Sequence, residues 1–379
     1  MKLGSRRTIV GLLGTTVVWV LGVVLASGQA AQEKPQMAED VFKNVQVLRG
    51  IPVDQFMETM GIFSASLGMS CEDCHAADDT NWENYAKDTS PRKQRAREMV
   101  LMVNAINKDN FQGRQVVGCY SCHGGGDRPK LTPSLATLYG VPPPEEVDGI
   151  FPQAPGAPPA DQILDKYLQG LGGTQRLAKL TSFVAKGTSA GYGPENEKRP
   201  VEIYAKAPGQ RTTIIHTGSG DATSTFDGRA AWVAAPHRPV PVLALTGHEL
   251  DAAKLNAGLS FPAQIKQALS GWHVGFPATI NDRRAVPVQG TSAGGAIATM
   301  YFDEETGLLV RLVHFADSPV GRSPTQIDYA DYRDLAGVKM PFRWTVTWLD
   351  GRETFELSGV QPNVAIDAAR FTRPAPPKQ

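Results

Sequence analysis

Cysteine is scarce in this chain, with four in 379 residues. Net charge is absent as well, because 38 lysines and arginines balance 38 aspartates and glutamates. A neutral balance lacks the basic signature of nucleic-acid binding, so we expect no nucleic-acid partner. No cysteine lies near the apolar N-terminal segment, which excludes a lipoprotein anchor there. All four cysteines lie in two short runs, so no thiol is left over for another role.

Both runs have the pattern C-x-x-C-H: Cys71-Glu72-Asp73-Cys74-His75 and Cys119-Tyr120-Ser121-Cys122-His123. This pattern is typical of c-type haem attachment, in which two thiols form thioether links and the adjacent imidazole binds the iron. Zinc-binding or redox-active C-x-x-C pairs are the alternative. A zinc ribbon does not need a histidine directly after each second cysteine, and a redox pair needs a thioredoxin-like βαβ context, which is absent. The sequence therefore predicts two c-type haems, with His75 and His123 as iron ligands and Cys71, Cys74, Cys119 and Cys122 as covalent anchors.

The N-terminal segment fits a protein that leaves the cytoplasm. Arg6 and Arg7 precede an apolar run from Thr8 to Ala26, and small residues follow it. This arrangement predicts a signal peptide over residues 1–30. A retained membrane anchor is the alternative, because about 19 apolar residues are long enough to span a bilayer. Since haem c is attached outside the bacterial cytoplasm, we expect a periplasmic protein, either free or anchored to the inner membrane.

Composition changes sharply after residue 140. The stretch Val141 to Ala160 contains three consecutive prolines and four more. It predicts a semi-rigid linker with few contacts across it. Both haem motifs precede the linker, and none follows it. We therefore expect a multidomain chain, with a mainly α dihaem cytochrome c domain over residues 31–140, the linker over 141–160 and a β-rich domain over 161–379.

A helical pattern precedes each haem motif. The first helix is expected to begin at Pro52 and stop at Gly68, and the second to begin with Ser90 as N-cap and Pro91 at its first position. Basic residues crowd the start of the second helix, which is unfavourable at the positive end of a helix dipole. We expect the preceding acidic run or the haem propionates to offset this charge, unless the turn is solvated. The basic residues are Arg92, Lys93, Arg95 and Arg97.

Methionines on these helices are candidates for the sixth iron position, which methionine commonly fills in cytochromes c. Their spacing nominates Met60 for the first haem and Met99 for the second, with Met57 and Met102 as neighbouring alternatives. The opposing interpretation is that these side chains fill irregular gaps in the core. Other histidines could bind iron only if the two halves dock tightly, because they all follow the linker: His216, His237, His248, His273 and His314.

Segments around both motifs resemble the cytochrome subunit of photosynthetic reaction centres. The resemblance runs through Asn44-Val45-Gln46-Val47-Leu48, Phe56 and Thr59-Met60 to the first motif, and through Arg97-Glu98-Met99, Ile106-Asn107 and Val117-Gly118 to the second motif and Gly124-Gly125. In that family a helix with the methionine ligand precedes each haem, which implies Met60 as the sixth ligand of the first haem and Met99 of the second. The family has four haems, whereas this chain has two motifs, so a photosynthetic role does not follow.

After the linker, a short helix from Asp161 gives way to strand patterns of period two separated by tight turns. The expected fold is an α+β antiparallel half-barrel of about ten strands. Helices are expected near His248–Ala257 and Pro262–Leu269. The clearest strands are Val201–Ala205, Thr212–His216, Ala231–Ala234, Ala296–Phe302, Leu308–Phe315, Phe342–Leu349 and Thr354–Leu357.

Several short features are found in this half: Ile163-Leu164-x-x-Tyr167 with Leu171-Gly172-Gly173, Phe226-Asp227-Gly228, Tyr301–Val310 and Asp328–Pro341. With these features the half resembles the LolA- and LolB-like lipoprotein carriers of the periplasm. The resemblance implies a concave apolar face that holds acyl chains, and hence a lipid or lipoprotein partner. A scaffold with a filled core is the alternative.

Two G-x-S-x-G stretches, around Ser189 and Ser292, are not followed by a helix and so lack the context of a catalytic serine.

These features favour a periplasmic protein that transfers single electrons rather than an enzyme. If Met60 and Met99 bind the two irons, no coordination position is left open. One alternative is a haem enzyme such as a dihaem peroxidase, which would need a five-coordinate iron with polar distal groups. Another is a redox-sensing module that binds a lipid or lipoprotein. The sequence names no redox partner.

Overall fold

The computed structural model describes residues 34–75, 82–140, 148–191, 197–236 and 238–377. Lys34–Gln379 forms one compact unit. The predicted signal peptide or anchor, residues 1–30, lies outside the described residues. Within the described part, no helix is long and apolar enough to cross a membrane.

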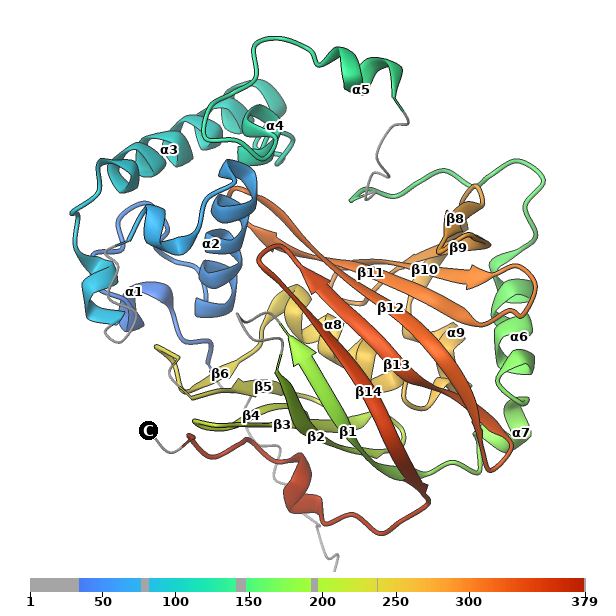
Figure 1. Ribbon diagram of the computed structural model, residues 1–379. Coiled ribbons are helices and arrows are strands. Elements are labelled where there is room, and N and C mark those ends of the chain that lie inside the picture. The colour runs from blue at the N-terminus through green and yellow to red at the C-terminus, as the bar shows by residue number, and fades with distance from the viewer. Residues whose placement is uncertain (1–33, 76–81, 141–147, 192–196, 237, 378–379) are drawn as a thin grey trace, which may run out of the picture. The chain divides into compact units, whose positions relative to one another are not determined.

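Helices form the half of the chain that carries both C-x-x-C-H motifs, called the helical half below (residues 34–140; Figure 1). One predicted helix begins just after Pro52 and ends where Gly68 adopts a left-handed conformation with φ of 62°. The other begins at Pro91, and Ser90 Oγ accepts a hydrogen bond from Arg92 N at 3.3 Å. Both predicted helices are therefore confirmed. The elements are α1 (Ala38–Val41), α2 (Val53–Leu67), η1 (Cys71–Asp73), η2 (Trp82–Ala86), α3 (Pro91–Phe111), α4 (Cys119–His123) and α5 (Leu135–Tyr139).

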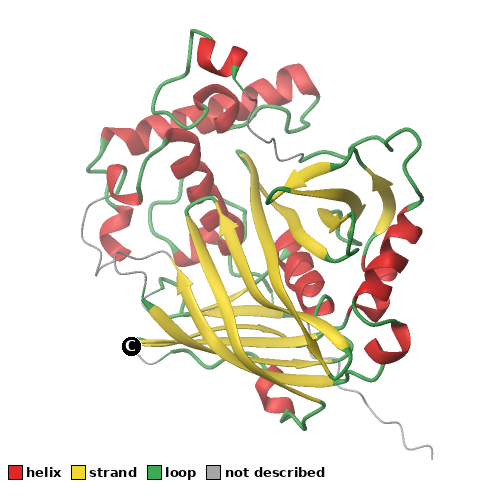
Figure 2. Cartoon of the chain, turned by 45° about the vertical axis from the view of Figure 1, so that its right-hand side comes forward, coloured by secondary structure: helices red, strands yellow, loops and turns green. Residues whose placement is uncertain are grey.

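The described residues from 148 onward, called the sheet half, form a 14-stranded antiparallel sheet with short helices (Figures 1 and 2). Its strand order is β6-β5-β4-β3-β2-β1-β14-β13-β12-β11-β10-β9-β7, with β8 beside β9. The strands are β1 (Ser182–Gly191), β2 (Lys198–Lys206), β3 (Gln210–Thr217), β4 (Gly220–Phe226), β5 (Ala231–Ala234), β6 (Val242–Ala244), β7 (Ser270–Val274), β8 (Ala278–Ile280), β9 (Arg283–Thr291), β10 (Ile297–Asp303), β11 (Leu309–Ser318), β12 (Gly321–Leu335), β13 (Val338–Trp348) and β14 (Gly351–Pro362). The helices are α6 (Ala160–Gly170), α7 (Thr174–Leu177), α8 (Gly247–Gly258), η3 (Pro262–Gln264), α9 (Ile265–Ala268) and η4 (Ala368–Phe371).

The antiparallel sheet predicted from period-two patterns is confirmed, although fourteen strands replace the expected ten or so. All seven strands named from the sequence are present, as β2, β3, β5, β10, β11, β13 and β14. The sheet curls, because α8 contacts β3, β4 and β5 near one end of the strand order and β11 near the other. Figure 1 shows α8 and α9 in the hollow of this curve.

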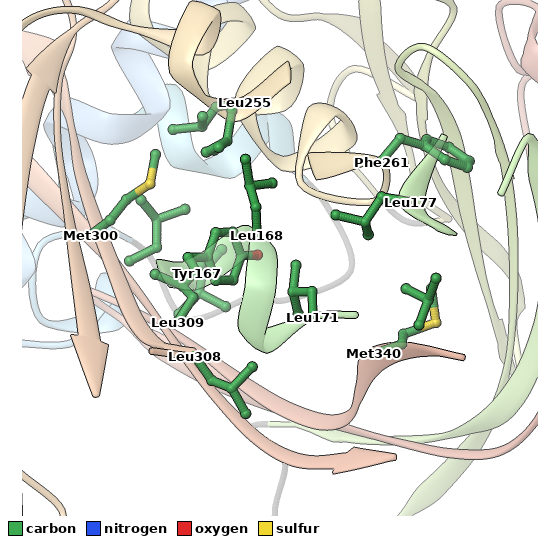
Figure 3. Packing of buried hydrophobic residues seen from close by; sticks show 14 of the residues in the cluster. Tyr167, Leu168, Leu171, Leu177, Leu255, Phe261, Met300, Leu308, Leu309 and Met340 are labelled. Carbon is green, nitrogen blue, oxygen red and sulfur yellow. The ribbon is translucent and has the colours of Figure 1, made fainter. Parts of the chain in front are cut away.

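The main core lies between the concave face of the sheet and the helices on it (Figure 3). Tyr167 and Leu168 of α6 lie close to Met300 and Leu309 of the sheet, and Leu255 of α8 covers them from another side. A second, smaller cluster belongs to the helical half and contains Leu48, Ile62, Val100, Cys119 and Val320. Val320 comes from the sheet half, so the two cores are joined.

The expectation that few contacts would cross between the halves is wrong. The tip of the β11–β12 hairpin, residues 318–321, reaches into the helical half and places Val320 in its core with 0% of its surface exposed. Hydrogen bonds reinforce this junction. Side chains of α2 and of the segment before α4, and the first amide of α4, donate to backbone carbonyl groups of the sheet half. They include Gln55 Nε2 to Asp317 O (3.1 Å), Gln115 Nε2 to Ser318 O (2.7 Å) and Cys119 N to Val320 O (3.0 Å).

The described part of the predicted linker, residues 148–160, is bonded to the sheet and is not a free spacer. Ala154 N donates to Val274 O at 2.7 Å, and Val274 N donates to Gln153 Oε1 at 2.8 Å. These bonds satisfy backbone groups of β7, which ends the sheet and would otherwise leave them unpaired. The linker prolines do not prevent this, because Gln153 and Ala154 lie between them. The domain boundaries near residues 140 and 160 stay predictions.

Candidate functional site

The first haem motif is a short 3-10 turn held by its own side chains. Asp73 accepts hydrogen bonds from Ser70 N at 2.8 Å and Ser70 Oγ at 3.0 Å, and these bonds lower the pKa of the Asp73 carboxyl. His75 Nδ1 lies 2.9 Å from the carbonyl oxygen of Tyr85, and the two rings stack with centroids 4.8 Å apart. The motif is therefore fixed from η2 as well as from its own turn.

Basic residues at the start of α3 meet the acidic groups expected to offset them. Arg97 pairs with Asp88 at 2.8 Å, and Lys93 lies 3.4 Å from the same carboxylate. Arg92 lies 3.4 Å from the Asp73 carboxylate of the first motif. Hydrogen bonds from Arg97 are the main reason that the pKa of Asp88 lies far below its usual range. The acidic run therefore compensates at least three of these cations within the protein.

The second motif forms the single helical turn α4. His123 Nδ1 lies 3.0 Å from Gly126 O. Cys119 is buried, which raises the pKa of its thiol to about 11. Its amide donates to Val320 O, and a side chain at Gly118 would meet that same oxygen, since an added Cβ would lie 2.6 Å from it. Close backbone approach to the hairpin tip is thus the reason for glycine directly before the motif.

Both motif histidines place the same ring nitrogen, Nδ1, against a backbone carbonyl oxygen. A carbonyl oxygen only accepts hydrogen bonds, so Nδ1 of His75 and of His123 must carry the proton. The lone pair then lies on Nε2 in each ring, which is the arrangement that metal-binding imidazoles use. Burial also lowers the pKa of His75, which favours the neutral, metal-binding form. The residues present therefore fit a haem iron at each motif.

Exposed apolar side chains are frequent in the stretch of chain that contains the second motif. Eight of the eleven large hydrophobic residues exposed in the described part of the chain lie between residues 101 and 139. Uncovered apolar surface of this kind marks a place where another apolar body binds. A haem macrocycle attached at Cys119 and Cys122 is such a body, so this surface also fits the group. The eight are Leu101, Met102, Val116, Tyr120, Leu131, Leu135, Leu138 and Tyr139.

The nominated methionines lie on the expected helices, and their ligation stays a prediction. Met60 of α2 is half-buried and packs against the cluster that contains Cys119. This contact is part of the packing of α2 against α4. Met99 of α3 is half-buried as well. Met57 is half-buried, while Met102 is 42% exposed. Of the other histidines, His237 lies outside the described residues, and the rest belong to the sheet half.

A buried acidic group at the start of α2 joins the two halves. The carboxylate of Asp54, on α2, accepts hydrogen bonds from Thr246 N at 2.6 Å and Thr246 Oγ1 at 2.8 Å, and so caps α8. Glu249, in the first turn of α8, has its pKa raised to about 8, mainly by burial and further by the nearby charges of Glu58 and Asp54. Burial raises the pKa of Glu58 in the same way.

A cavity of about 530 Å³ lies in the sheet half, between α8 and strands β1–β5 and β11–β14. Its lining is mostly apolar, but Arg211, Glu249, Asn256 and His314 also face it. Asn256 Oδ1 and His314 Nε2 have no hydrogen-bond partner among the described residues. Sequence reasoning missed these four residues as parts of one site and considered His314 only among the histidines that could bind iron. No local pattern marks them, since they come from β3, α8 and β11.

Within the described residues, no group of three or more His, Cys, Asp or Glu side chains could hold a metal ion.

The two serines of the G-x-S-x-G stretches are parts of the sheet. Ser292 Oγ donates to Asp251 at 2.6 Å and accepts from Ala296 N at 2.9 Å, so this serine closes a turn before β10. Ser189 lies inside β1. Neither serine precedes a helix, as expected.

Residues 20–136 match the model of the photosynthetic reaction centre cytochrome C subunit family. The N-terminal part is thus related to c-type cytochromes. It is 32% identical over 97 residues to the reaction center cytochrome c subunit of Roseobacter denitrificans, and 35% identical over 116 residues to cytochrome c-554 of Chloroflexus aurantiacus. These matches cover 24% and 28% of this chain and 26% and 25% of the relatives, so the chain spans about a quarter of their length. The resemblance seen in the motifs is confirmed, and it implies covalently bound haem.

Solved structures that match do so over the sheet half. A DUF1329 family protein from Desulfovibrio piger has a TM-score of 0.40 at 10% identity, and a LolA superfamily protein from Nitrosomonas europaea has 0.37 at 12% identity. Each match covers 57% of this chain and 98% of the other.

Proposed function

We propose that this chain is a periplasmic c-type cytochrome with two covalently bound haems that carries single electrons, either free or anchored to the inner membrane by its N-terminal segment. One observation carries the proposal. In both C-x-x-C-H motifs the histidine donates a hydrogen bond from Nδ1 to a backbone carbonyl oxygen, which leaves the lone pair of Nε2 available to a metal. The family match over residues 20–136 supports the same chemistry.

Each residue has one role in this proposal. Cys71 and Cys74 anchor the first haem and Cys119 and Cys122 the second, while His75 and His123 bind the irons through Nε2. Met60 and Met99 are the proposed sixth ligands. The haem iron supplies one-electron redox chemistry, and a thioether ligand raises its reduction potential. The surrounding helices orient the imidazoles, and the hydrogen bonds that their Nδ1 atoms donate to Tyr85 O and Gly126 O fix their tautomers.

The sheet half is proposed to bind an apolar molecule. The cavity of about 530 Å³ supports this function, because ligand sites are typically concave and mostly apolar, with a few placed polar groups. Its partner would be a lipid or a lipoprotein chain, as the sequence resemblance implies.

Axial ligation is tested by Met60→Ala and Met99→Ala in the full chain. Each variant should gain a high-spin component, bind carbon monoxide when reduced and lower the potential of one haem. Met57→Ala and Met102→Ala, on the same two helices, are the matched controls and should leave the spectra unchanged. Unchanged low-spin spectra in both test variants would mean that these methionines only pack the core.

Peroxidase turnover separates the carrier from a haem enzyme. If both irons have six protein and haem ligands, peroxide finds no open position, so turnover should be negligible while small redox dyes exchange electrons readily. Saturable peroxidase turnover by the wild-type protein would refute the electron-carrier proposal and favour the dihaem enzyme.

A further inference from the structure

The cavity of the sheet half contains a cation without an anionic partner. Arg211 reaches it from β3, donates to Ser260 Oγ at 2.8 Å and lies 5.8 Å from the ring centroid of Trp344. No carboxylate of the described residues lies within ion-pair distance of its guanidinium. Burial lowers the pKa of Arg211, yet a guanidinium keeps its charge in proteins. Four of its five N–H donors therefore lack a hydrogen-bond acceptor among the described residues.

Other titratable groups on the cavity wall do not neutralise this charge near pH 7. Burial raises the pKa of Glu249 to about 8, with Glu58 and Asp54 adding to the shift, so this carboxyl is mostly protonated. Burial lowers the pKa of His314 to about 4, so its imidazole is neutral. Glu353 is paired with Arg199 at 3.1 Å. Arg238 and Lys339, at the exposed margin, add positive charge.

The cavity is also long. Helix α8 runs along it, with Glu249 in its first turn and Ser260, the partner of Arg211, just past its end. Eleven residues at 1.5 Å each separate these two positions by roughly 16 Å along the helix. The wall between them is lined by apolar side chains, among them Ile203, Ile215, Leu259, Ile327, Met340 and Phe355.

We propose that this cavity binds a single-chain amphiphile with a carboxylate head group, such as a long-chain fatty acid, with the head group at Arg211 and the chain along the apolar wall. A cation enclosed by apolar surface is costly unless a charged partner and hydrogen bonds compensate it, and a carboxylate supplies both. The proposal rests on the ligand-binding function proposed above for the sheet half and adds the chemistry of the ligand.

A pair of probes tests the head group without any mutation. The haem-loaded full chain is titrated with cis-parinaric acid and with its methyl ester, which has the same chain but no charge. The acid should bind at least about tenfold more tightly, since a hydrogen bond to a charged group is worth that factor or more. If neither probe binds, the ligand-binding function itself fails. If both bind equally, the cavity accepts apolar chains but Arg211 does not select the head group, and this inference is wrong.

Variants then locate the site. Arg211→Gln should weaken binding of the acid about tenfold or more and leave binding of the ester unchanged, and Arg211→Lys should retain part of the preference. Arg333→Gln is the matched control, because Arg333 also lies over an aromatic ring, that of Phe342, but does not line the cavity. An effect of Arg333→Gln as large as that of Arg211→Gln would contradict the assignment.

Discussion

Val320, at the tip of the β11–β12 hairpin, is the side chain through which the sheet half completes the core of the helical half. It is fully buried in a cluster with Ile62, Val100 and Cys119, and its carbonyl oxygen accepts the hydrogen bond from the Cys119 amide. Val320→Ala removes two methyl groups from this core and leaves the backbone bond possible. We expect it to destabilise the whole unit and to loosen the second haem motif.

The size of the effect follows from burial. At about 0.8 kcal/mol for each buried methyl or methylene group, the lost transfer free energy is about 1.6 kcal/mol. Incomplete collapse of the space left behind adds to this, so the total loss in the free energy of unfolding should be about 2 kcal/mol. That corresponds to a factor of about 30 in the unfolding equilibrium.

Two measurements check this prediction. In denaturant, haem absorbance and tryptophan fluorescence should report one transition, because the halves share a core, and Val320→Ala should shift both signals together. Hydrogen exchange at the Cys119 amide should also accelerate. Val274→Ala is the matched control, since Val274 is equally buried but belongs to the sheet core, and it should not loosen Cys119 selectively. Separate transitions for the two signals, or unchanged exchange at Cys119, would refute the reasoning.

Three further results are expected. Asp54→Ala should lower the free energy of unfolding by about 1–3 kcal/mol, because it leaves the Thr246 donors at the start of α8 without their acceptor, whereas Asp54→Asn should cost less; chemical denaturation measures both. The pKa of His314 is depressed, so its contribution to stability is present above about pH 6.5 and is lost as pH falls toward 4; His314→Phe should flatten that part of the stability profile. The pKa of Glu249 is raised, so stability should fall as pH rises from about 4.5 toward 8, and Glu249→Gln should remove this slope in thermal unfolding measured across that range.

Local patterns predicted much of this structure. The apolar face of α2, the Ser90 cap of α3 and the alternation in β2 and β3 are set by neighbouring residues, so they can be read in sequence. The C-x-x-C-H runs carry their chemistry in five consecutive residues. Contacts over long sequence separations have no such signature: the hydrogen bond from Cys119 N to Val320 O joins positions about two hundred residues apart. The burial of Asp54 also has no local signature. Its carboxylate is buried because it accepts hydrogen bonds from Thr246 at the start of α8.

The cavity residues show the same limit in another way. Arg211 is one polar residue at the start of a strand and would be exposed if the sheet were flat. Curling brings it under the end of α8, beside Ser260 and Trp344, where it becomes a half-buried cation on the cavity wall. Sheet curvature depends on how all the strands twist and pack together. A short segment of sequence therefore does not predict it.

The hairpin tip also sets an order of events during synthesis. A ribosome completes the second haem motif long before it reaches Val320, and the core around Ile62 and Val100 lacks its last side chain during that interval. Closing so long a loop costs entropy that the contacts then have to offset, so this core should form late. A nascent chain that stops short of the hairpin would thus present Cys119 on an unfinished surface. The core around the second haem motif is therefore complete only after the distant C-terminal strands have folded.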